Sequence, residues 1–269
     1  MPTNAQPPGS GRKSISRQTC DDDTPHLITH VETTAAPVAD GAVTPAIHQA
    51  LPQHGLLPTI HIVDTGFLDA ELLVTSRQDD DVDLLGPARP DVKWQAQAGQ
   101  GFDAQRFVID WEAQQATCPQ GHTSINWTPA IDNRQTPVIK ITFSTTDCGA
   151  CPCRSQCIRS QKKDVRRTIT VRPKEHYLAL KARRERAQTP EYAAEYARSA
   201  GIEGTISQGV RVLRLRRTRY FGLARTHLSH VLTAAGLNLL RVGDWLAGTP
   251  RAKTRRSPFV ALMKQPLAA

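Results

Sequence analysis

The feature that most constrains the fold is an alternation of strand and helix patterns between residues 27 and 87. Short apolar segments rich in β-branched residues predict three strands, LITHVETT (27–34), PTIHIVD (58–64) and VDLLGP (82–87). Two helical patterns, TPAIHQAL (44–51) and LDAELLVTSR (68–77), separate the strands. In the first, Thr44 is the expected N-cap and Pro45 takes the first helical position. This alternation predicts an α/β fold whose sheet contains parallel strands.

The remaining chain divides by pattern. Residues 1–16 contain Pro, Gly and Ser without apolar periodicity, so they are predicted to be a disordered N-terminus, followed by the α/β part at 17–87. Segments such as RFVIDWEAQQATC and VIKITFSTTDC predict an antiparallel, β-rich insertion over 88–172. A helical part is predicted over 173–262, with a tail at 263–269. Its helices are expected at 176–187, from Thr189-Pro190 to about Gly201, and at 226–246.

Charge is distributed unevenly between the two ends of the chain. Residues 1–153 contain 9 Lys and Arg against 18 Asp and Glu, whereas residues 154–269 contain 25 against 7. A basic half of this size favours a polyanionic partner, most simply nucleic acid; the alternatives are a solvated basic surface, or binding to ribosomes or a membrane surface. The chain has no apolar run of 18 residues and no apolar N-terminal signal, so a cytoplasmic protein without a membrane partner is predicted.

One glutamate precedes a cluster of arginines in GIEGTISQGVRVLRLRRTRYFG (201–222). As a helix, this stretch places Ile202, Ile206, Val210 and Leu213 on one apolar stripe, with Glu203 beside the stripe. Glu203 then shares its face with arginines that would meet a phosphate backbone. The alternative is an N-terminal Glu favoured by the helix dipole, with arginines for solubility.

Asp64 ends the predicted buried strand at 58–64 and is followed by Thr65-Gly66. The carboxyl ends of strands are where α/β sheets place functional groups. Two or three such carboxylates would hold Mg²⁺ ions about 4 Å apart for phosphoryl transfer. The alternative is an Asp that only caps a turn or helix.

A series of segments, in order, resembles the DDE transposases of bacterial insertion sequences. The segments are HIVDTGFLDAELL, VDLLGP, GFDAQRFVIDWE, CPQG, CGACPCRSQC, YARSAGIEGTISQGVR and RRTRYFGLARTHLSHVLTAAGLNLLR, within residues 19–262. The closer resemblance is to the group with a cysteine-bearing β insertion before the final glutamate. It implies a ribonuclease-H-like fold and metal-dependent DNA strand cleavage and joining.

The resemblance also implies roles for particular residues. Asp64 matches the family's second catalytic Asp, expected to end a central strand, and Glu203 matches the final Glu. Together they would bind Mg²⁺ or Mn²⁺. DNA-backbone contacts are implied for the arginines that follow, namely Arg211, Arg214, Arg216, Arg217 and Arg219. The implied partners are transposon-end and target DNA, and either a second copy of the chain or a full-length transposase.

Two positions depart from the family pattern. The strand of the first catalytic Asp would precede Cys20, where MPTNAQPPGSGRKSISRQT contains no acid, while Asp21, Asp22 and Asp23 fall in an expected hairpin turn. Near the final Glu, Ser199 stands where the family has Arg, and Arg198 is displaced by one. The resulting interpretation is a truncated and catalytically incomplete transposase. The alternatives are a non-catalytic DNA-binding derivative and a basic RNA-binding zinc-ribbon protein.

The cysteines suggest a metal site. Cys148-x-x-Cys151 and Cys157, with Cys118 in a preceding CPxG turn, have the spacing of a four-thiolate Zn²⁺ site that would staple the insertion. The alternative is reduced, unliganded thiols, and Cys153 and Cys20 are left outside the set.

Histidines and tryptophans are predicted to be structural. The nine histidines form no HxH or HExxH pair, and Trp94, Trp111 and Trp127 are expected in the core of the insertion.

Overall fold

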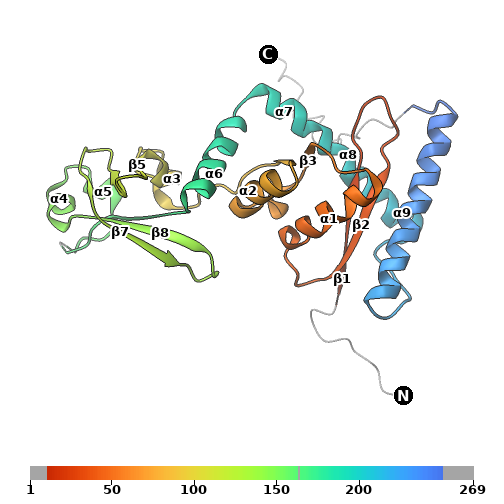
Figure 1. The fold of residues 1–269 in the computed structure, drawn as a ribbon, viewed down its shortest axis with the longest axis horizontal. Coiled ribbons are helices and arrows are strands. Elements are labelled where there is room, and N and C mark those ends of the chain that lie inside the picture. The colour runs from red at the N-terminus through yellow and green to blue at the C-terminus, as the bar shows by residue number, and fades with distance from the viewer. Residues whose placement is uncertain (1–10, 163, 251–269) are drawn as a thin grey trace, which may run out of the picture. The chain divides into compact units, whose positions relative to one another are not determined.

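The structure is a computed structural model that describes residues 11–162 and 164–250 (Figure 1). It mixes helices and strands, as the α/β prediction requires. The chain forms two compact units: unit 1 comprises residues 1–58 and 193–269, and unit 2 comprises residues 59–192. Unit 2 therefore contains the predicted insertion together with the strand and helix patterns on either side of it. Within the described residues, no helix is both long and apolar enough to cross a membrane.

Unit 1 is built on an antiparallel hairpin of β1 (Arg12–Gln18) and β2 (Ile28–Ala35). The predicted turn at Asp21–Asp23 is confirmed, since these residues lie between the two strands. The prediction of disorder is wrong over residues 12–16, whereas residues 1–10 lie outside the described part. Pairing with β2 gives backbone partners to a segment that is polar in composition, and it buries Ile15 to 6% exposure.

Short helical elements follow the hairpin, namely η1 (Asp40–Val43), α1 (Thr44–Ala50) and η2 (Leu51–His54). The predicted helix at 44–51 is confirmed, but Thr44 is not its N-cap. Because η1 runs directly into α1, Thr44 already has helical backbone angles (φ −57°, ψ −45°), and it is buried. Val43 occupies the cap position instead.

The helices that lead into and complete unit 1 are α7 (Pro190–Ala197), η5 (Arg198–Ala200), α8 (Gly201–Leu213) and α9 (Leu223–Leu246). Thr189 caps α7 as predicted, because its Oγ1 accepts a hydrogen bond from the Tyr192 backbone N–H at 3.2 Å. The helix α9 lies along the β1–β2 hairpin (Figure 1). Their contact buries a small core of Ile28, Ala234 and Leu237, so the two ends of the described chain stabilise one another.

Unit 2 begins with β3 (Ile60–Ile62) and β4 (Asp83–Leu85), which pair in parallel as predicted. Between them lie η3 (Thr65–Phe67) and α2 (Ala70–Asp79), which is capped by the Asp69 carboxylate. The helix α6 (Lys174–Arg186) packs against α2. Arg183 of α6 is 5% exposed and donates hydrogen bonds to the Asp83 carboxylate and the Leu84 carbonyl, which ties the helix to β4.

The rest of unit 2 is antiparallel, as predicted for the insertion. A pair is formed by β5 (Val108–Asp110) and β6 (Gln115–Thr117), and a sheet by β7 (Ser124–Ile131), β8 (Pro137–Phe143) and β9 (Thr168–Val171). The short helical elements are α3 (Trp94–Ala98), η4 (Ala104–Arg106), α4 (Thr145–Ala150) and α5 (Arg154–Cys157).

The core of this antiparallel part is small, with Phe107, Phe143 and Ile141 among its buried side chains. Trp111 and Trp127 pack against this core with their rings edge to face, at a centroid distance of 5.5 Å. The prediction of a structural role is therefore confirmed for these two. Trp94 lies on α3 under the guanidinium of Arg159.

Candidate functional site

Asp64 lies immediately beyond β3, where pairing with β4 ends. The backbone N–H of Val63 still donates to the Leu85 carbonyl at 2.8 Å, and the chain then turns into η3. The Asp64 carboxylate is exposed and accepts a hydrogen bond from the Gly66 backbone N–H at 2.7 Å. Asp64 is thus both a strand-end acid and the cap of a turn, the two roles that the sequence left open.

The strand before Asp64 is not central. Among the described residues β3 pairs only with β4, so the prediction of a central strand is wrong for this structure. The hairpin β1–β2 forms a separate two-stranded sheet. The Asp64 carboxylate is therefore presented at the end of a two-stranded parallel pair.

Glu203 lies in the first turn of α8, and its side chain is exposed. A carboxylate is favoured there by the partial positive charge of the helix N-terminus. Glu203 forms no hydrogen bond or ion pair with another residue of the described part of the chain. Its oxygens are accordingly available to solvent or to a ligand.

The buried face of α8 differs from the predicted stripe. Ile206 is 46% exposed, whereas Thr205 is 3% exposed and Gly209 is buried. The reason is a polar network: the Thr205 hydroxyl donates to Gln18 Oε1 at 2.6 Å and accepts from the Arg241 guanidinium. A periodicity of apolar residues does not reveal such a face.

The helix also ends earlier than the arginine pattern implied. Arg214 adopts a left-handed conformation (φ 54°) as the C-cap of α8, and its backbone N–H donates to the Gly209 carbonyl. Arg211 therefore lies on the helix, but Arg216, Arg217 and Arg219 lie in the connection to α9. All five predicted arginines are exposed, so they form a basic surface of Arg211, Arg214, Arg216, Arg217 and Arg219.

Arg198, which is displaced from the family's arginine position, has partners inside unit 1. Its guanidinium donates to Asp21 Oδ1 at 2.7 Å and to the Cys20 carbonyl at 3.3 Å. The ion pair joins the hairpin turn to the segment that precedes α8. This gives Arg198 a structural role in positioning the turn.

The two predicted metal-binding acids belong to different units, Asp64 to unit 2 and Glu203 to unit 1. In the part of the chain that the structure describes, no group of three or more His, Cys, Asp or Glu side chains could hold a metal ion as it stands. A metal ion shared by Asp64 and Glu203 stays a prediction.

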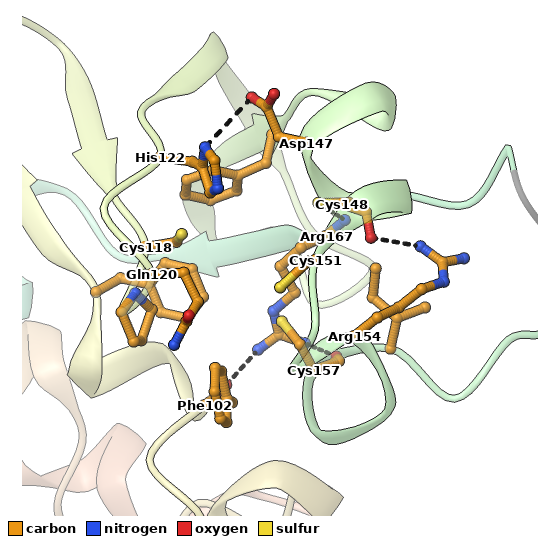
Figure 2. Close-up of a pocket in the computed structure, with 14 residues that line it drawn as sticks. Phe102, Cys118, Gln120, His122, Asp147, Cys148, Cys151, Arg154, Cys157 and Arg167 are labelled. Carbon is orange, nitrogen blue, oxygen red and sulfur yellow. Dashed lines mark hydrogen bonds and ion pairs between the residues drawn. The ribbon is translucent and has the colours of Figure 1, made fainter.

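Four of the six cysteines line one pocket of unit 2 (Figure 2). Cys118 follows β6, Cys148 lies on α4, Cys151 is its C-cap, and Cys157 ends α5. The pocket has an empty volume of about 430 Å³ that includes open solvent. The cysteines that line the pocket are therefore the four chosen from the sequence. Cys153 and Cys20 are not among them.

Two arginines of the cysteine pocket were missed from the sequence. Arg154 donates to the Cys148 carbonyl at 3.1 Å, and Arg167 donates to the Cys157 carbonyl at 3.4 Å. Burial raises the pKa of Cys157 to about 11, and the neighbouring thiols add to this rise, whereas Arg167 opposes it. Burial also lowers the pKa of Arg167. Arg154 lies within the cysteine motif CGACPCRSQC, and this position is a sequence signal that could have identified it.

Three histidines also meet between β2 and α9, although no sequence spacing indicated this. Thr33 Oγ1 lies 2.8 Å from His230 Nδ1 and 3.2 Å from His227 Nδ1, and His30 Nε2 lies 3.5 Å from Glu32 Oε2. Burial lowers the pKa of His230, and His227 adds to the effect. Burial also lowers the pKa of His30, which Glu32 partly offsets. His230 is 7% exposed and all of these contacts lie within unit 1, in keeping with the predicted structural role.

Residues 117–242 match a family model described as "Transposase DDE domain". The matched segment contains Glu203, the basic surface and the four pocket cysteines, and it leaves Asp64 outside. Comparisons with curated proteins and with solved structures gave no match.

Proposed function

We propose that this protein is related to the DDE transposases and binds DNA through the basic surface that begins in the last turn of α8. The observation that supports this most directly is the family match, because the matched residues include both Glu203 and all five exposed arginines. A relation to transposases implies a DNA partner and a divalent metal ion. The subgroup with a cysteine-bearing insertion and the ribonuclease-H-like fold are part of the same proposal.

The basic surface suits a phosphate backbone better than a small anion. Its arginines extend from the last turn of α8 into the connection to α9, and none of them is buried. Guanidinium groups spread in this way neutralise successive phosphates and release counterions, which gives an affinity that depends on salt and little on sequence.

Asp64 and Glu203 are the residues that we propose as metal ligands. Both carboxylates are exposed, and hard oxygen donors are the ligands that Mg²⁺ and Mn²⁺ prefer. A bound ion would supply Lewis acidity for the attacking and leaving oxygens of a phosphodiester. The contribution of this chain is to present one acid at a strand end and the other in the first turn of α8, the helix whose last turn begins the basic surface.

Catalysis by the 269-residue chain would need a third carboxylate beside Asp64 and Glu203. The segment before Cys20 includes β1 (Arg12–Gln18), but it contains no Asp or Glu that could supply a third carboxylate. A site that lacks one ligand holds its metal ions poorly. We therefore propose that the 269-residue chain binds duplex DNA without cleaving it.

A salt titration of DNA binding tests the first part of this proposal. Fluorescence anisotropy with a labelled duplex would compare the wild-type chain with Arg216→Gln/Arg217→Gln/Arg219→Gln. The matched control is Arg89→Gln/Arg106→Gln/Arg134→Gln, which removes the same charge from exposed positions of the acidic half. We expect the first variant to reduce the slope of log K against log salt by about 3, since each phosphate contact contributes about 0.9. The control should leave the slope unchanged.

Three results would count against the proposal. Equal losses in both triple variants would mean that only net charge matters. A preference for RNA over duplex DNA would favour an RNA-binding protein. Cleavage of DNA by the wild-type chain with Mg²⁺ or Mn²⁺, abolished by Glu203→Ala, would show that its metal site is complete. Asp64→Ala and Glu203→Ala should otherwise retain full DNA affinity.

A further inference from the structure

We propose that Cys118, Cys148, Cys151 and Cys157 bind a structural Zn²⁺ ion that ties together the loops of the antiparallel part of unit 2. The four thiols come from three separate segments of the chain, yet they line the same pocket (Figure 2). A set of four thiolates is one of the structural zinc environments found in proteins. This inference is independent of DNA binding.

Turns hold the backbone at two of the cysteines, Cys118 and Cys151. After Cys118, the Gly121 N–H donates to the Cys118 carbonyl at 2.9 Å, with Gly121 at φ 85°. The Cys118 N–H itself donates to the His122 carbonyl at 2.8 Å. The Arg154 N–H likewise donates to the Cys151 carbonyl at 3.1 Å. Turns of this kind fix the position of the Cβ atoms before any metal binds.

The surroundings provide the second layer of interactions that thiolate ligands need. The Arg167 backbone N–H donates to Cys148 Sγ at 3.4 Å. The side chains of Arg154 and Arg167 line the same pocket. A Zn²⁺ ion with four thiolates has a net charge of −2, which two nearby guanidinium groups would offset.

The other cysteines do not share this environment. Cys153 is the N-cap of α5 and is not among the residues that line the pocket, and Cys20 belongs to unit 1. His122 and Asp147 also line the pocket, with His122 Nδ1 3.9 Å from Asp147 Oδ2. His122, whose ring nitrogen could replace a thiolate, is the competing ligand that the test addresses.

The side chains must move for the ion to bind. As they stand, the described residues offer no group of three or more potential ligands that could hold a metal. Zinc requires sulfurs about 2.3 Å away in a tetrahedral arrangement, so binding requires the four thiols to approach one another more closely. The gain is structural: the buried core cluster of this part consists of Phe107, Ala116, Ile141, Phe143, Ile169 and Val171, and a bound ion would add a cross-link between its loops.

Metal analysis of the full chain tests the site. The wild-type protein, purified under reducing conditions, should contain about one zinc ion per chain. Replacement of zinc by Co²⁺ should give thiolate-to-cobalt charge-transfer absorption and the strong visible bands of a tetrahedral site. Serine variants of each pocket cysteine should lose most of the metal, whereas Cys20→Ser, Cys153→Ser and His122→Ala should retain it.

Several outcomes would overturn the inference. These are substoichiometric zinc in the reduced wild-type chain, Co²⁺ spectra without thiolate bands, and equal metal loss in Cys153→Ser and Cys148→Ser. Zinc lost in His122→Ala but kept in Cys157→Ser would also overturn this ligand set. The cobalt spectrum of the wild-type chain decides the matter even where a serine variant fails to fold.

Discussion

Asn238 of α9 is joined to Ile28 of β2 by both ends of its side-chain amide. Its Nδ2 donates to the Ile28 carbonyl at 2.9 Å, and its Oδ1 accepts from the Ile28 N–H at 2.8 Å. The two residues are 210 positions apart in sequence. Because Ile28 opens β2, this pair completes the backbone hydrogen bonding of the strand with a side chain from the C-terminal helix.

Asn238→Ala should therefore destabilise unit 1. The substitution leaves a partly buried N–H and carbonyl without partners, at a cost of about 1–3 kcal/mol in the free energy of unfolding. Urea unfolding followed by circular dichroism would measure it. Gln53→Ala, which removes an exposed amide in the same unit, is the matched control and should change the free energy by less than about 0.5 kcal/mol. Similar losses in both variants would contradict the assigned role of Asn238.

Because of the histidines between β2 and α9, we expect the free energy of unfolding to fall in mild acid. The pKa values of His30 and His230 are lowered in the folded chain, so between about pH 6.5 and those lower values the unfolded chain binds more protons. The stabilisation is fully present above about pH 6.5 and is lost as the pH falls through the folded pKa values. Arg17 and His227 act in the same direction on His30, and Glu32 opposes them.

His230→Gln should reduce this dependence on pH. The free energy of unfolding of the wild-type chain, measured in urea at pH 7.5 and 5.5, should drop more than that of the variant. The difference is limited to about 1.4 kcal/mol for each unit by which the pKa is lowered. The exposed His54→Gln serves as the control and should behave like the wild type. An unchanged drop in His230→Gln would show that other groups cause the effect.

Substitution of Arg183 is expected to lower the free energy of unfolding of unit 2. It is 5% exposed and bound to Asp83 and to the Leu84 carbonyl, and Arg186 shares the same carboxylate. Arg186 would still pair with Asp83, but Arg183→Met leaves the buried Leu84 carbonyl without this donor and should cost about 1–3 kcal/mol. Lys181→Met, at an exposed position of the same helix, should be close to neutral. Thermal unfolding of the two variants would distinguish them, and equal melting temperatures would refute the prediction.

At position 86, next to the end of β3, any side chain is expected to destabilise unit 2. A Cβ atom there would lie 2.4 Å from the Val63 carbonyl oxygen, which belongs to the backbone and cannot move cheaply. Gly86→Ala should therefore destabilise unit 2 by about 1–3 kcal/mol. Gly149→Ala, on the helix α4 with open space around it, should be neutral or stabilising by up to about 1 kcal/mol. A neutral Gly86→Ala would contradict the close approach.

The sequence by itself determined those elements whose signal is local. Apolar periodicity and turn residues located β2, β3 and β4, the helices α1, α2, α6 and α9, and the antiparallel character of the insertion. The spacing of the cysteines selected the four that line one pocket. These signals succeed because strand and helix preferences, caps and short motifs act over a few residues.

The tertiary structure alone decided the features that depend on distant partners. Residues 12–16 became part of β1 because β2 supplies their hydrogen bonds, although their own composition predicted disorder. The buried face of α8 is set by Gln18 and Arg241 through Thr205, against the apolar stripe. Contacts between residues some 200 positions apart, such as Thr33 with His230, leave no periodicity in the sequence. Their energy comes from burial and from hydrogen bonds that exist only once the ends of the chain meet.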